Sequence, residues 1–526
     1  MILSATMSND FASGLTTAIT LDRLLGYAAS QRPDDIALVD PPNRAEFTTG
    51  APRTLTYAQA ERTVAAIAAR LYRLGLQPGQ AVGLQLPNTV EGVLAFLGVL
   101  RAGLIASPLP LLWRQADCAA AMAMIGAQGL IASARIATTD HGELALHTAA
   151  EVFTIRHVCV FGGSHDGMVP LDDVFDASPE SVPVPAPQPT SGRDAATPRG
   201  ARMAAATWDV DAAGLLPVAR SHIELTAAGF EIMLEGRFAA RSVILSSLCL
   251  GSLAGIASTL ASWLLSRGTL VLHHPFDPSV MRRQILDHRC DVVIVPGSLA
   301  VRCAEAGMFR DSTVGKVVAV WRAPERLAAC QSWQLPSPSL MDVTVFGETG
   351  LIAATRGPDG KSAGLRPGAA PRQDAPVLIE AMRTAGGTIA LRGPMVPPHR
   401  FPRNTDKEPD PTADPALAAD AAGFVDTAYP CRVLPGSGTL VVTGPPAGIV
   451  TVGGYRFVVA KLRDAVAGID PSAMIAAFPD GLTGQRIAGA AVRREDVQEA
   501  LAALGLSPLV VNAFRPRRGN EARNAA

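Results

Sequence analysis

Short apolar runs alternate with amphipathic helical stretches through the first part of the chain, and this alternation constrains the fold most. Residues 57–74 carry apolar side chains at helical spacing, and Gly75 ends that stretch. A short strand is expected at 81–86, a second helix at 90–100 and a further strand at 105–109. Strands joined through helices run parallel, so we predict an α/β protein built around a largely parallel sheet.

The chain changes character past Gly444, and this change predicts a domain boundary. The strand-and-helix alternation continues before it, with apolar runs at 271–272, 291–296 and 316–320. A Pro- and Ser-rich stretch at 178–199 is expected to be a linker or an exposed loop. We expect a large N-terminal domain over residues 1–443 and a small α+β domain over residues 444–526.

Size and charge exclude several classes of protein. A chain of 526 residues, 48% of them hydrophobic, can bury the cores of more than one domain. The formal net charge of −1 gives no electrostatic reason to bind nucleic acid, so no nucleic-acid partner is expected. Seven dispersed cysteines, with no Cys-x-x-Cys pair and no signal peptide, indicate buried thiols in a reducing compartment. A cytoplasmic location is therefore expected.

An uncharged segment from residue 242 to residue 266 is long enough to cross a bilayer. Its seven serines dilute the hydrophobicity, and Arg267 and a strand-like run at 269–272 follow directly. A membrane span and a buried strand followed by a buried helix both fit this length. The serines favour the buried pair, so no membrane span is expected.

The stretch from Thr207 to Pro217 has the frame of a strand-to-helix turn that would wrap a nucleotide triphosphate. The hydroxyls, most of the glycines and the lysine of such a loop are missing, and only Gly214 remains. Asp209 and Asp211 stand where a polyanion would lie. A carboxylate about 4 Å from a phosphate oxygen costs on the order of 4 kcal/mol at an effective dielectric of about 20. The stretch is interpreted as a degenerate nucleotide loop that is now a surface turn.

Several short motifs occur in a fixed order along the chain. They are Leu-Pro-Asn at 86–88, Leu-Arg-Ala-Gly at 100–103, Phe-Asp-Pro at 276–278, Phe-Gly-Glu-Thr at 346–349, Gly-Phe-Val-Asp-Thr at 423–427 and Val-Gly-Gly-Tyr-Arg at 452–456. In this order they resemble the adenylate-forming, AMP-binding superfamily, which includes acyl- and aryl-CoA synthetases and peptide-synthetase adenylation domains. The resemblance covers roughly residues 20 to 500.

The resemblance implies a fold, a site and a reaction. The fold is a large N-terminal domain of stacked α/β layers with a small C-terminal α+β domain, and the active site lies between them. The implied reaction is the attack of a carboxylate on ATP, which gives an acyl-adenylate, followed by transfer of the acyl group to a thiol.

The magnesium-binding motif of the family is altered here. Its matching residues are Phe346 and Gly347, followed by Glu348 and Thr349, and the family's glutamate position is Gly350. On an extended backbone Glu348 would point to the same face as Gly350, so a metal site rescued by Glu348 is an open alternative. Glu348 and Thr349 are the only catalytic candidates, and Glu348 is the only candidate metal ligand.

Other contacts that the family makes to ATP are also missing. Tyr429 stands where the family has a ribose-binding aspartate, and the loop lysine position falls at or beside Pro217. The catalytic lysine near the end of the chain corresponds to Asn520 or Glu521. The chain has only four lysines, and none falls in either lysine-bearing motif. Together with Asp209, Asp211, Gly214, Phe346 and Gly347, Tyr429 forms the degenerate nucleotide site.

The acyl pocket of the family corresponds to Gly251, Ser252 and Gly255. Gly251 and Ser252 replace a frequent aromatic–histidine pair. Small residues leave more open volume, so a widened pocket for a bulky acyl group and a simple loss of constraint are both open interpretations.

Two functions from different classes follow. The first is an acyl-CoA synthetase-like pseudoenzyme, a binding or regulatory homologue with no cofactor; its partner would be an acyl-CoA, an acyl carrier protein or a related pathway enzyme. The second is a working acyl- or aryl-CoA, or acyl-carrier-protein, ligase that uses ATP and magnesium. It would have a relocated site built from Glu348 and Thr349 with Arg220 or Arg517. The simultaneous loss of several ATP contacts favours the first, so adenylation is expected to be lost.

Overall fold

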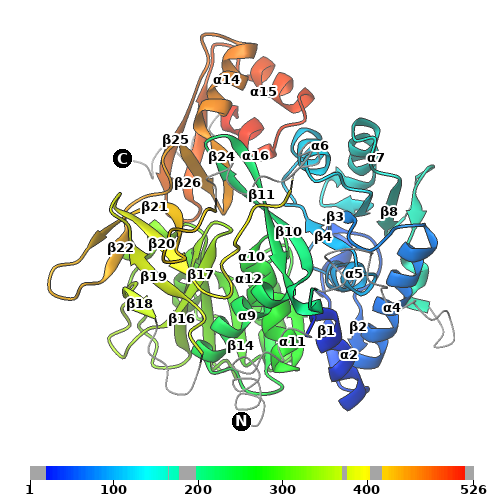
Figure 1. Ribbon diagram of the computed structural model, residues 1–526, viewed down its shortest axis with the longest axis horizontal. Helices are drawn as coiled ribbons and strands as arrows, with labels where there is room; N and C mark the ends of the chain where they lie inside the picture. The colour runs from blue at the N-terminus through cyan, green and yellow to red at the C-terminus, as the bar shows by residue number, and fades with distance from the viewer. Residues whose placement is uncertain (1–18, 164, 177–196, 370–375, 403–416, 516–526) are drawn as a thin grey trace.

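The computed structural model describes residues 19–163, 165–176, 197–369, 376–402 and 417–515 (Figure 1). Two large sheets form the N-terminal part, and a small sheet with its own helices lies above them in Figure 1. The stretch expected to be a linker at 178–199 lies almost wholly outside the described residues.

The first large sheet has seven strands in the order β11-β10-β4-β3-β5-β8-β9. They are β3 (Ala81–Gln85), β4 (Ile105–Pro108), β5 (Gly129–Ser133), β8 (His157–Phe161), β9 (Val169–Pro170), β10 (Met203–Asp211) and β11 (Gly214–Ser221). All neighbours pair in parallel except β10 and β11, which form an antiparallel hairpin at one edge. The strands predicted at 81–86 and 105–109 are β3 and β4.

The second large sheet has eight strands in the order β17-β16-β15-β14-β12-β13-β1-β2. They are β1 (Ile36–Val39), β2 (Thr54–Thr56), β12 (Val243–Ser246), β13 (Thr269–Leu272), β14 (Val292–Pro296), β15 (Lys316–Trp321), β16 (Ser339–Phe346) and β17 (Gly350–Thr355). Pairing is parallel from β1 to β16, and only the two edge strands β2 and β17 are antiparallel. The largely parallel α/β prediction is confirmed.

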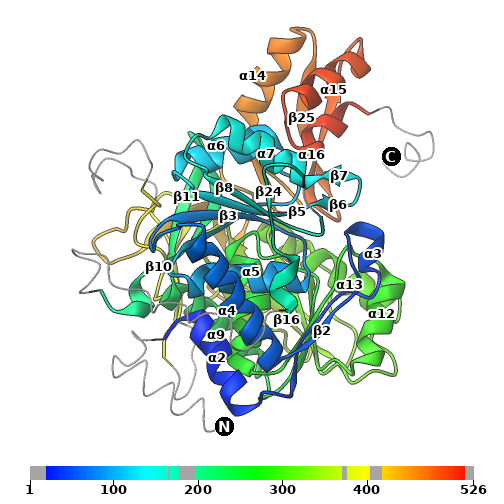
Figure 2. The same cartoon turned by 90° about the vertical axis from the view of Figure 1, so that its right-hand side faces the viewer.

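One apolar core joins the two large sheets. Helices that contribute to it include α2 (Leu21–Gln31), α4 (Tyr57–Arg73), α5 (Val90–Arg101) and α9 (His222–Gly236) (Figure 2), and the helical run at 253–266 also contributes. The core contains Leu84 from the first sheet and Leu270 from the second. Every residue of α5 from Val90 to Leu100 is buried, as expected of a helix that is covered on all sides.

Local sequence sets where these helices begin. At the start of α4 the Thr56 hydroxyl accepts the Gln59 N–H at 3.3 Å, and the Gln59 side chain accepts the Thr56 N–H at 2.8 Å. Ser221 and Glu224 form the same capping box at the start of α9. Each pair satisfies backbone donors that the first turn of a helix leaves free.

The uncharged segment at 242–266 is a buried strand followed by a buried helical run, as predicted. After β12 come α10 (Leu253–Gly255), a π-helical turn (Ile256–Ala261) and α11 (Ser262–Ser266). Serine hydroxyls in this run bond to carbonyls one turn earlier; for example, Ser262 donates to Ala257 at 2.9 Å. Within the described ranges, no helix is both long enough and apolar enough to cross a membrane.

The remaining helices cover the outer faces of the two large sheets or connect their strands. They are α3 (Arg44–Phe47), α6 (Gln115–Met124), α7 (His141–Glu151), α12 (Pro278–Asp287) and α13 (Gly297–Glu305), with 3-10 turns at Asp172–Asp176, Arg199–Ala201 and η5 (Pro324–Ala329). A two-stranded ribbon consists of β6 (Arg135–Ile136) and β7 (Thr139–Asp140).

Two smaller sheets complete the structure. The first runs in the order β18-β19-β20-β21-β22, with β18 (Gly368–Ala369), β19 (Glu380–Arg383), β20 (Thr388–Arg392), β21 (Val425–Val433) and β22 (Leu440–Val442). The second runs β24-β23-β26-β25, with β23 (Ile449–Val452), β24 (Tyr455–Val458), β25 (Met474–Asp480) and β26 (Gly484–Ala490). Its helices are α14 (Val459–Ile469), α15 (Arg494–Ala503) and α16 (Pro508–Val511), followed by a 3-10 turn (Asn512–Phe514). We call residues 449–515 the C-terminal module.

Candidate functional site

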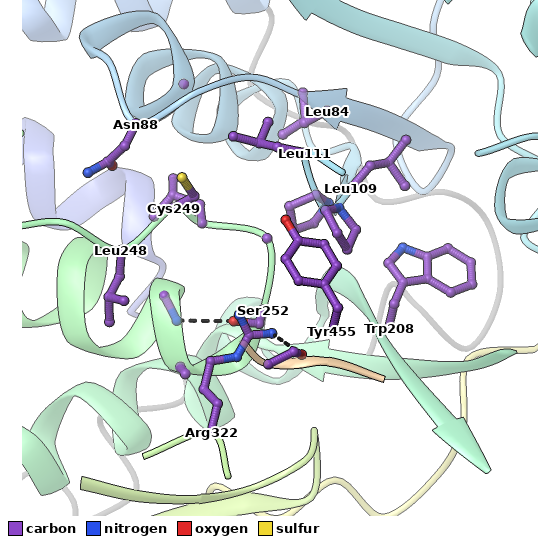
Figure 3. Close-up of a pocket in the computed structure, with 18 of the residues that line it drawn as sticks. Leu84, Asn88, Leu109, Leu111, Trp208, Leu248, Cys249, Ser252, Arg322 and Tyr455 are labelled. Carbon is purple, nitrogen blue, oxygen red and sulfur yellow. Dashed lines mark hydrogen bonds between the residues drawn. The ribbon is translucent and has the colours of Figure 1, made fainter. Parts of the chain in front are cut away.

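A cavity of about 220 Å³ lies where the two large sheets meet the C-terminal module (Figure 3). The segments that follow β3, β4 and β12 line it, together with the turn between β16 and β17. The turn between β23 and β24 closes one side. The carboxyl ends of parallel strands are where open α/β sheets usually bind their ligands. We call this space the first cavity.

Most of the wall of the first cavity is apolar. Leu109, Leu111 and Trp208 lie on one side of it (Figure 3). Trp208 packs edge-on against Trp113 with ring centroids 5.8 Å apart, and its indole N–H donates to the Ser107 hydroxyl at 3.0 Å. Such a wall suits the aromatic or aliphatic body of a small ligand.

The three pocket residues expected from the sequence, Gly251, Ser252 and Gly255, all line the first cavity. The Ser252 hydroxyl accepts the Gly255 N–H at 3.4 Å and caps α10. A side chain at Gly255 would meet the Cys249 carbonyl oxygen at 1.8 Å, so the loop after β12 can close onto α10 only over a glycine. The Cys249 thiol is half-buried in the same loop.

The stretch from Thr207 to Pro217 consists of the end of β10, a short turn and the start of β11. The prediction of a strand-to-helix turn was therefore wrong. β10 and β11 pair up to Asp211 and Gly214, which leaves a two-residue turn. The Asp211 carboxylate accepts the N–H groups of Ala213 at 2.8 Å and Gly214 at 3.0 Å. This local bond stabilises a tight hairpin where the frame suggested a wider loop before a helix. Backbone N–H groups at such a turn could bind an anion, but these two already bind a carboxylate of the same chain.

Asp209 lies deeper in the hairpin and is buried. Its carboxylate accepts the N–H groups of Glu348 and Val210, each at 2.7 Å. It also forms an ion pair with Arg456 of the C-terminal module. Asp209 therefore joins the hairpin, the turn after β16 and the C-terminal module, and all its contacts are internal.

Glu348 does not lie on an extended backbone, which corrects the premise of the sequence-based rescue of a metal site. Phe346 pairs with Gly350, so the three residues between them form a tight turn, in which Gly347 has a φ of +55°. The Glu348 carboxylate lines the first cavity and accepts the Leu253 N–H at 2.8 Å. Burial raises the pKa of Glu348 to about 7, and the neighbouring Asp209 raises it further while Arg220 lowers it. Thr349 is buried and does not line the cavity.

Tyr429 and Phe346 fill the space beside this turn. The two rings pack edge-to-face with centroids 5.6 Å apart, and each residue is only 1% exposed. The Arg456 guanidinium lies 5.7 Å from the centre of the Tyr429 ring. Burial raises the pKa of Tyr429 to about 12, so its phenol stays protonated and does not reproduce a charged aspartate. Neither aromatic residue lines the first cavity.

The C-terminal module reaches the site through the turn between β23 and β24. Gly454 has a φ of +91°, and its carbonyl accepts an N–H of Arg322 at 2.9 Å. The Tyr455 hydroxyl projects into the first cavity (Figure 3) and accepts the Leu112 N–H at 3.3 Å. On α14, Lys461 donates to the Ala213 carbonyl at the hairpin tip, at 2.6 Å. The module thus contacts both the cavity and the hairpin.

Sequence reasoning missed several of these residues. Nothing in the pattern marked Arg322 or Cys249, because each is brought to the cavity only by the arrangement of strands. Lys461 was excluded because it lies outside the expected lysine motifs. Arg220, a candidate of the ligase hypothesis, is fully buried, donates to the Met395 carbonyl at 2.9 Å and does not line the first cavity. Arg517 lies outside the described residues, as do the positions expected for the terminal lysine.

The acidic residues at the site do not fit a magnesium ion as they stand. Asp209 is paired with Arg456, and one Glu348 oxygen is bonded to the Leu253 N–H. In the described part of the chain, no group of three or more His, Cys, Asp or Glu side chains could hold a metal ion. Magnesium usually needs one or two free carboxylates and several waters.

One family model and several characterised proteins are similar in sequence to this chain. A family model described as "AMP-binding enzyme" matches residues 25–197. Salicyl-AMP ligase / salicyl-S-ArCP synthetase of Mycobacterium tuberculosis is 34% identical over 153 residues, which cover 29% of this chain and 26% of that protein. The chain thus spans about a quarter of the length of this relative. The 2-hydroxy-7-methoxy-5-methyl-1-naphthoate–CoA ligase of Streptomyces carzinostaticus is 25% identical over 508 residues, 90% of this chain and 84% of the ligase.

Solved structures match nearly the whole chain. The amide bond synthetase McbA from Marinactinospora thermotolerans has a TM-score of 0.67 at 18% identity, covering 94% of each chain. The apo structure of MbtA from Mycobacterium smegmatis has a TM-score of 0.65 at 22% identity, covering 97% of this chain and 92% of that one. These matches confirm the predicted fold class.

Proposed function

Because the chain belongs to the adenylate-forming, AMP-binding superfamily, we propose that it is a non-catalytic member that binds an aryl or acyl compound in the first cavity. The observation that carries the proposal is the Asp211 carboxylate bonded to the N–H groups of Ala213 and Gly214. A bound phosphate would need these two N–H groups as donors, but the Asp211 carboxylate already accepts both of them. A second anion there would meet Asp211 at close range and be repelled.

The neighbouring contacts support the same proposal. The Tyr429–Phe346 ring pair is buried, and the Asp209–Arg456 ion pair, formed by a buried carboxylate and a half-buried guanidinium, lies at the border of the first cavity. A nucleotide could enter only if the ion pair and the ring pair separated. Separation would leave the charge of Asp209 or Arg456 unpaired in a poorly solvated place. ATP and magnesium therefore do not fit the residues present.

The first cavity suits an aromatic or aliphatic carboxylic acid or its thioester. Leucine and tryptophan side chains form much of its wall, and the charged residues that line it are Arg322, Arg456, Asp209 and Glu348. Two relatives are named for a salicyl group and a naphthoate, which derive from aryl acids. One of these names also contains ArCP and the other CoA. We therefore include an acyl-CoA or an acyl carrier protein among the proposed partners.

In this proposal residues 444–526 form a separate domain that closes the first cavity. The contacts of Arg456, Tyr455 and Lys461 with the N-terminal part hold that domain in place. Closure would then retain a bound ligand, as a lid does, without positioning groups for a reaction.

A working ligase is the second candidate, and one observation favours it. Glu348 lines the first cavity with a pKa raised by burial to about 7, the kind of perturbed carboxyl that marks many active sites. The naphthoate relative is named a ligase, and its alignment with this chain covers 84% of its length. Under this candidate Glu348 would have to exchange its bond to Leu253 for a ligand.

Thiol protection separates the two candidates. Cys249 lines the first cavity, and 1-naphthoate bound there should slow its alkylation by iodoacetamide at alkaline pH in the absence of ATP. Peptide mass spectrometry reports the rate, and the Gly251→Phe variant, whose side chain fills the first cavity, should abolish the protection. Protection that requires ATP and magnesium, or pyrophosphate release on adding them with naphthoate, would establish the ligase instead. No protection under any condition would reject ligand binding in this cavity.

A further inference from the structure

A second cavity, of about 460 Å³, has no lining residue in common with the first. It is framed by η5, by the loop at residues 361–365 and by strands β21 and β22. Figure 1 shows β21 and β22 at the edge of the molecule, in the sheet that precedes the C-terminal module. Its volume falls within the roughly 300–1,000 Å³ typical of small-molecule sites.

The floor of the second cavity is apolar and buried. Leu327, Leu365 and Leu440 line it, and each is less than one-tenth exposed. Leu365 and Leu440 also exchange backbone hydrogen bonds, the shorter of them 2.7 Å, which fixes the loop against β22. The floor is therefore set by backbone pairing, and it can offer hydrocarbon contact without collapsing.

Small residues keep the cavity open. Ala328 and Ala363 line it without side chains long enough to fill it. Gly364 has a φ of +66°, and a side chain there would meet the Thr439 methyl at 2.2 Å, so the loop can approach β22 only through a glycine. The second cavity therefore stays open because the residues at these positions have small side chains or none.

The charges at the cavity are of one sign. Lys361, on the loop, and Arg432, on β21, both line it, and both are exposed. Among the described residues that line the cavity there is no Asp or Glu. Asp359 is the nearest acid along the loop, and its side chain accepts the Lys361 N–H at 3.1 Å. Lys361 is one of only four lysines in the chain.

We propose that the second cavity binds an amphipathic anion, namely a hydrocarbon chain or ring that ends in a carboxylate. The hydrocarbon part would contact Leu327, Leu365 and Leu440, and the carboxylate would lie between Lys361 and Arg432. This site is separate from the first cavity and does not depend on the proposed function there. No covalent step is involved.

Two cysteines of the chain make the test specific. All seven are free, and only Cys249 and Cys330 are not buried. Cys249 lines the first cavity and Cys330 lines the second. Sodium octanoate is the probe, and the full chain is alkylated with iodoacetamide at several octanoate concentrations. Protection of Cys330 reports on the second cavity, and protection of Cys249 reports separately on the first.

Octanoate is expected to protect Cys330, and the double variant Lys361→Gln/Arg432→Gln should weaken that protection about fivefold to tenfold in octanoate concentration. Protection by the uncharged octan-1-ol should be the same in both proteins. The matched control Arg463→Gln/Arg494→Gln removes the same charge from exposed positions of the C-terminal module and should change nothing. Because all four substituted side chains are exposed, folding should be preserved.

Two outcomes would overturn the proposal. One is the absence of Cys330 protection at octanoate concentrations that leave the protein folded. The other is protection that the double variant leaves unchanged, which would show an apolar site with no selection for anions. Either result leaves the first cavity untouched, because Cys249 and the Gly251→Phe variant report on that site alone.

Discussion

The first cavity and the region beside it use their space in opposite ways. In the cavity, small residues such as Gly251 and Gly255 leave about 220 Å³ open. Beside it Tyr429 and Phe346 pack against each other, and Asp209 and Arg456, which also line the cavity, pair with each other. Under the proposed function, the cavity keeps room for an acyl or aryl ligand, and the packed side chains beside it occupy the space that a nucleotide would need. We call Asp209, Phe346, Tyr429 and Arg456 the filled region.

Removing the ring of Tyr429 should produce the largest effect. Tyr429→Ala is expected to lower the free energy of unfolding by roughly 3–5 kcal/mol, because it leaves a hole against Phe346. Urea denaturation measures this change. The matched variant Leu111→Ala, on the half-buried wall of the first cavity, should cost clearly less. Equal losses of unfolding free energy in the two variants would show that the filled region is packed no more tightly than the wall of the first cavity.

The Asp209–Arg456 pair should be the next most sensitive contact. Asp209→Asn should cost roughly 3 kcal/mol, because it leaves the half-buried Arg456 charge without its partner. The same substitution in an Arg456→Gln background should cost much less, and this double-mutant cycle measures their coupling. The exposed pair Arg493–Asp496 serves as control and should contribute at most about 1 kcal/mol. A coupling as small as that of the control would mean that the filled region is not held by this pair.

Glu348 should make stability depend on pH. Its pKa is raised from 4.5 to about 7 by burial, so the folded protein holds a proton that the unfolded chain releases between these values. Stability should therefore fall as pH rises from about 4.5 to 7, and Glu348→Gln should remove this loss. Above pH 7 the variant should be more stable than the wild type by about 3 kcal/mol, and below pH 4.5 the two should be alike.

Thermal unfolding across this pH range measures the difference. Substitution of the exposed Glu499 by Gln is the control and should leave the pH profile unchanged. A Glu348→Gln profile parallel to that of the wild type would show that Glu348 is ionised at neutral pH, as a metal-binding carboxylate would be.

Loss of the Asp211 carboxylate should have the smallest effect on stability. Asp211→Ala removes two hydrogen bonds at the exposed hairpin tip and should cost about 1 kcal/mol. It also frees the N–H groups of Ala213 and Gly214, so inorganic pyrophosphate should bind the variant more tightly than the wild type. Calorimetric titration measures the affinity. Equal affinity would indicate that these N–H groups are not an anion site in either protein.

The sequence allowed the fold to be predicted well, because periodicity is a local property. The strands at 81–86 and 105–109 and the buried strand and helix at 242–266 were found where expected. The hairpin was predicted wrongly because strand pairing is not a local property of the sequence. The frame at 207–217 suggested a strand-to-helix turn, and only the pairing of β10 with β11 shows that Asp211 closes a two-residue turn.

The candidate site was predicted only in part. Gly251, Ser252 and Gly255 line the first cavity because they follow a strand that ends there, and their role in an acyl pocket stays a prediction. Arg322, Cys249 and the contact of Lys461 could not be found, since each depends on segments far apart in the chain.

Calorimetric titration of the full chain with ATP and magnesium tests the central claim most directly. The claim is that the filled region leaves no place for a nucleotide. The account predicts no binding tighter than about 1 mM, roughly −4 kcal/mol, while 1-naphthoate binds the same sample. Binding of ATP tighter than this limit would contradict the claim and would return the chain to the working ligases.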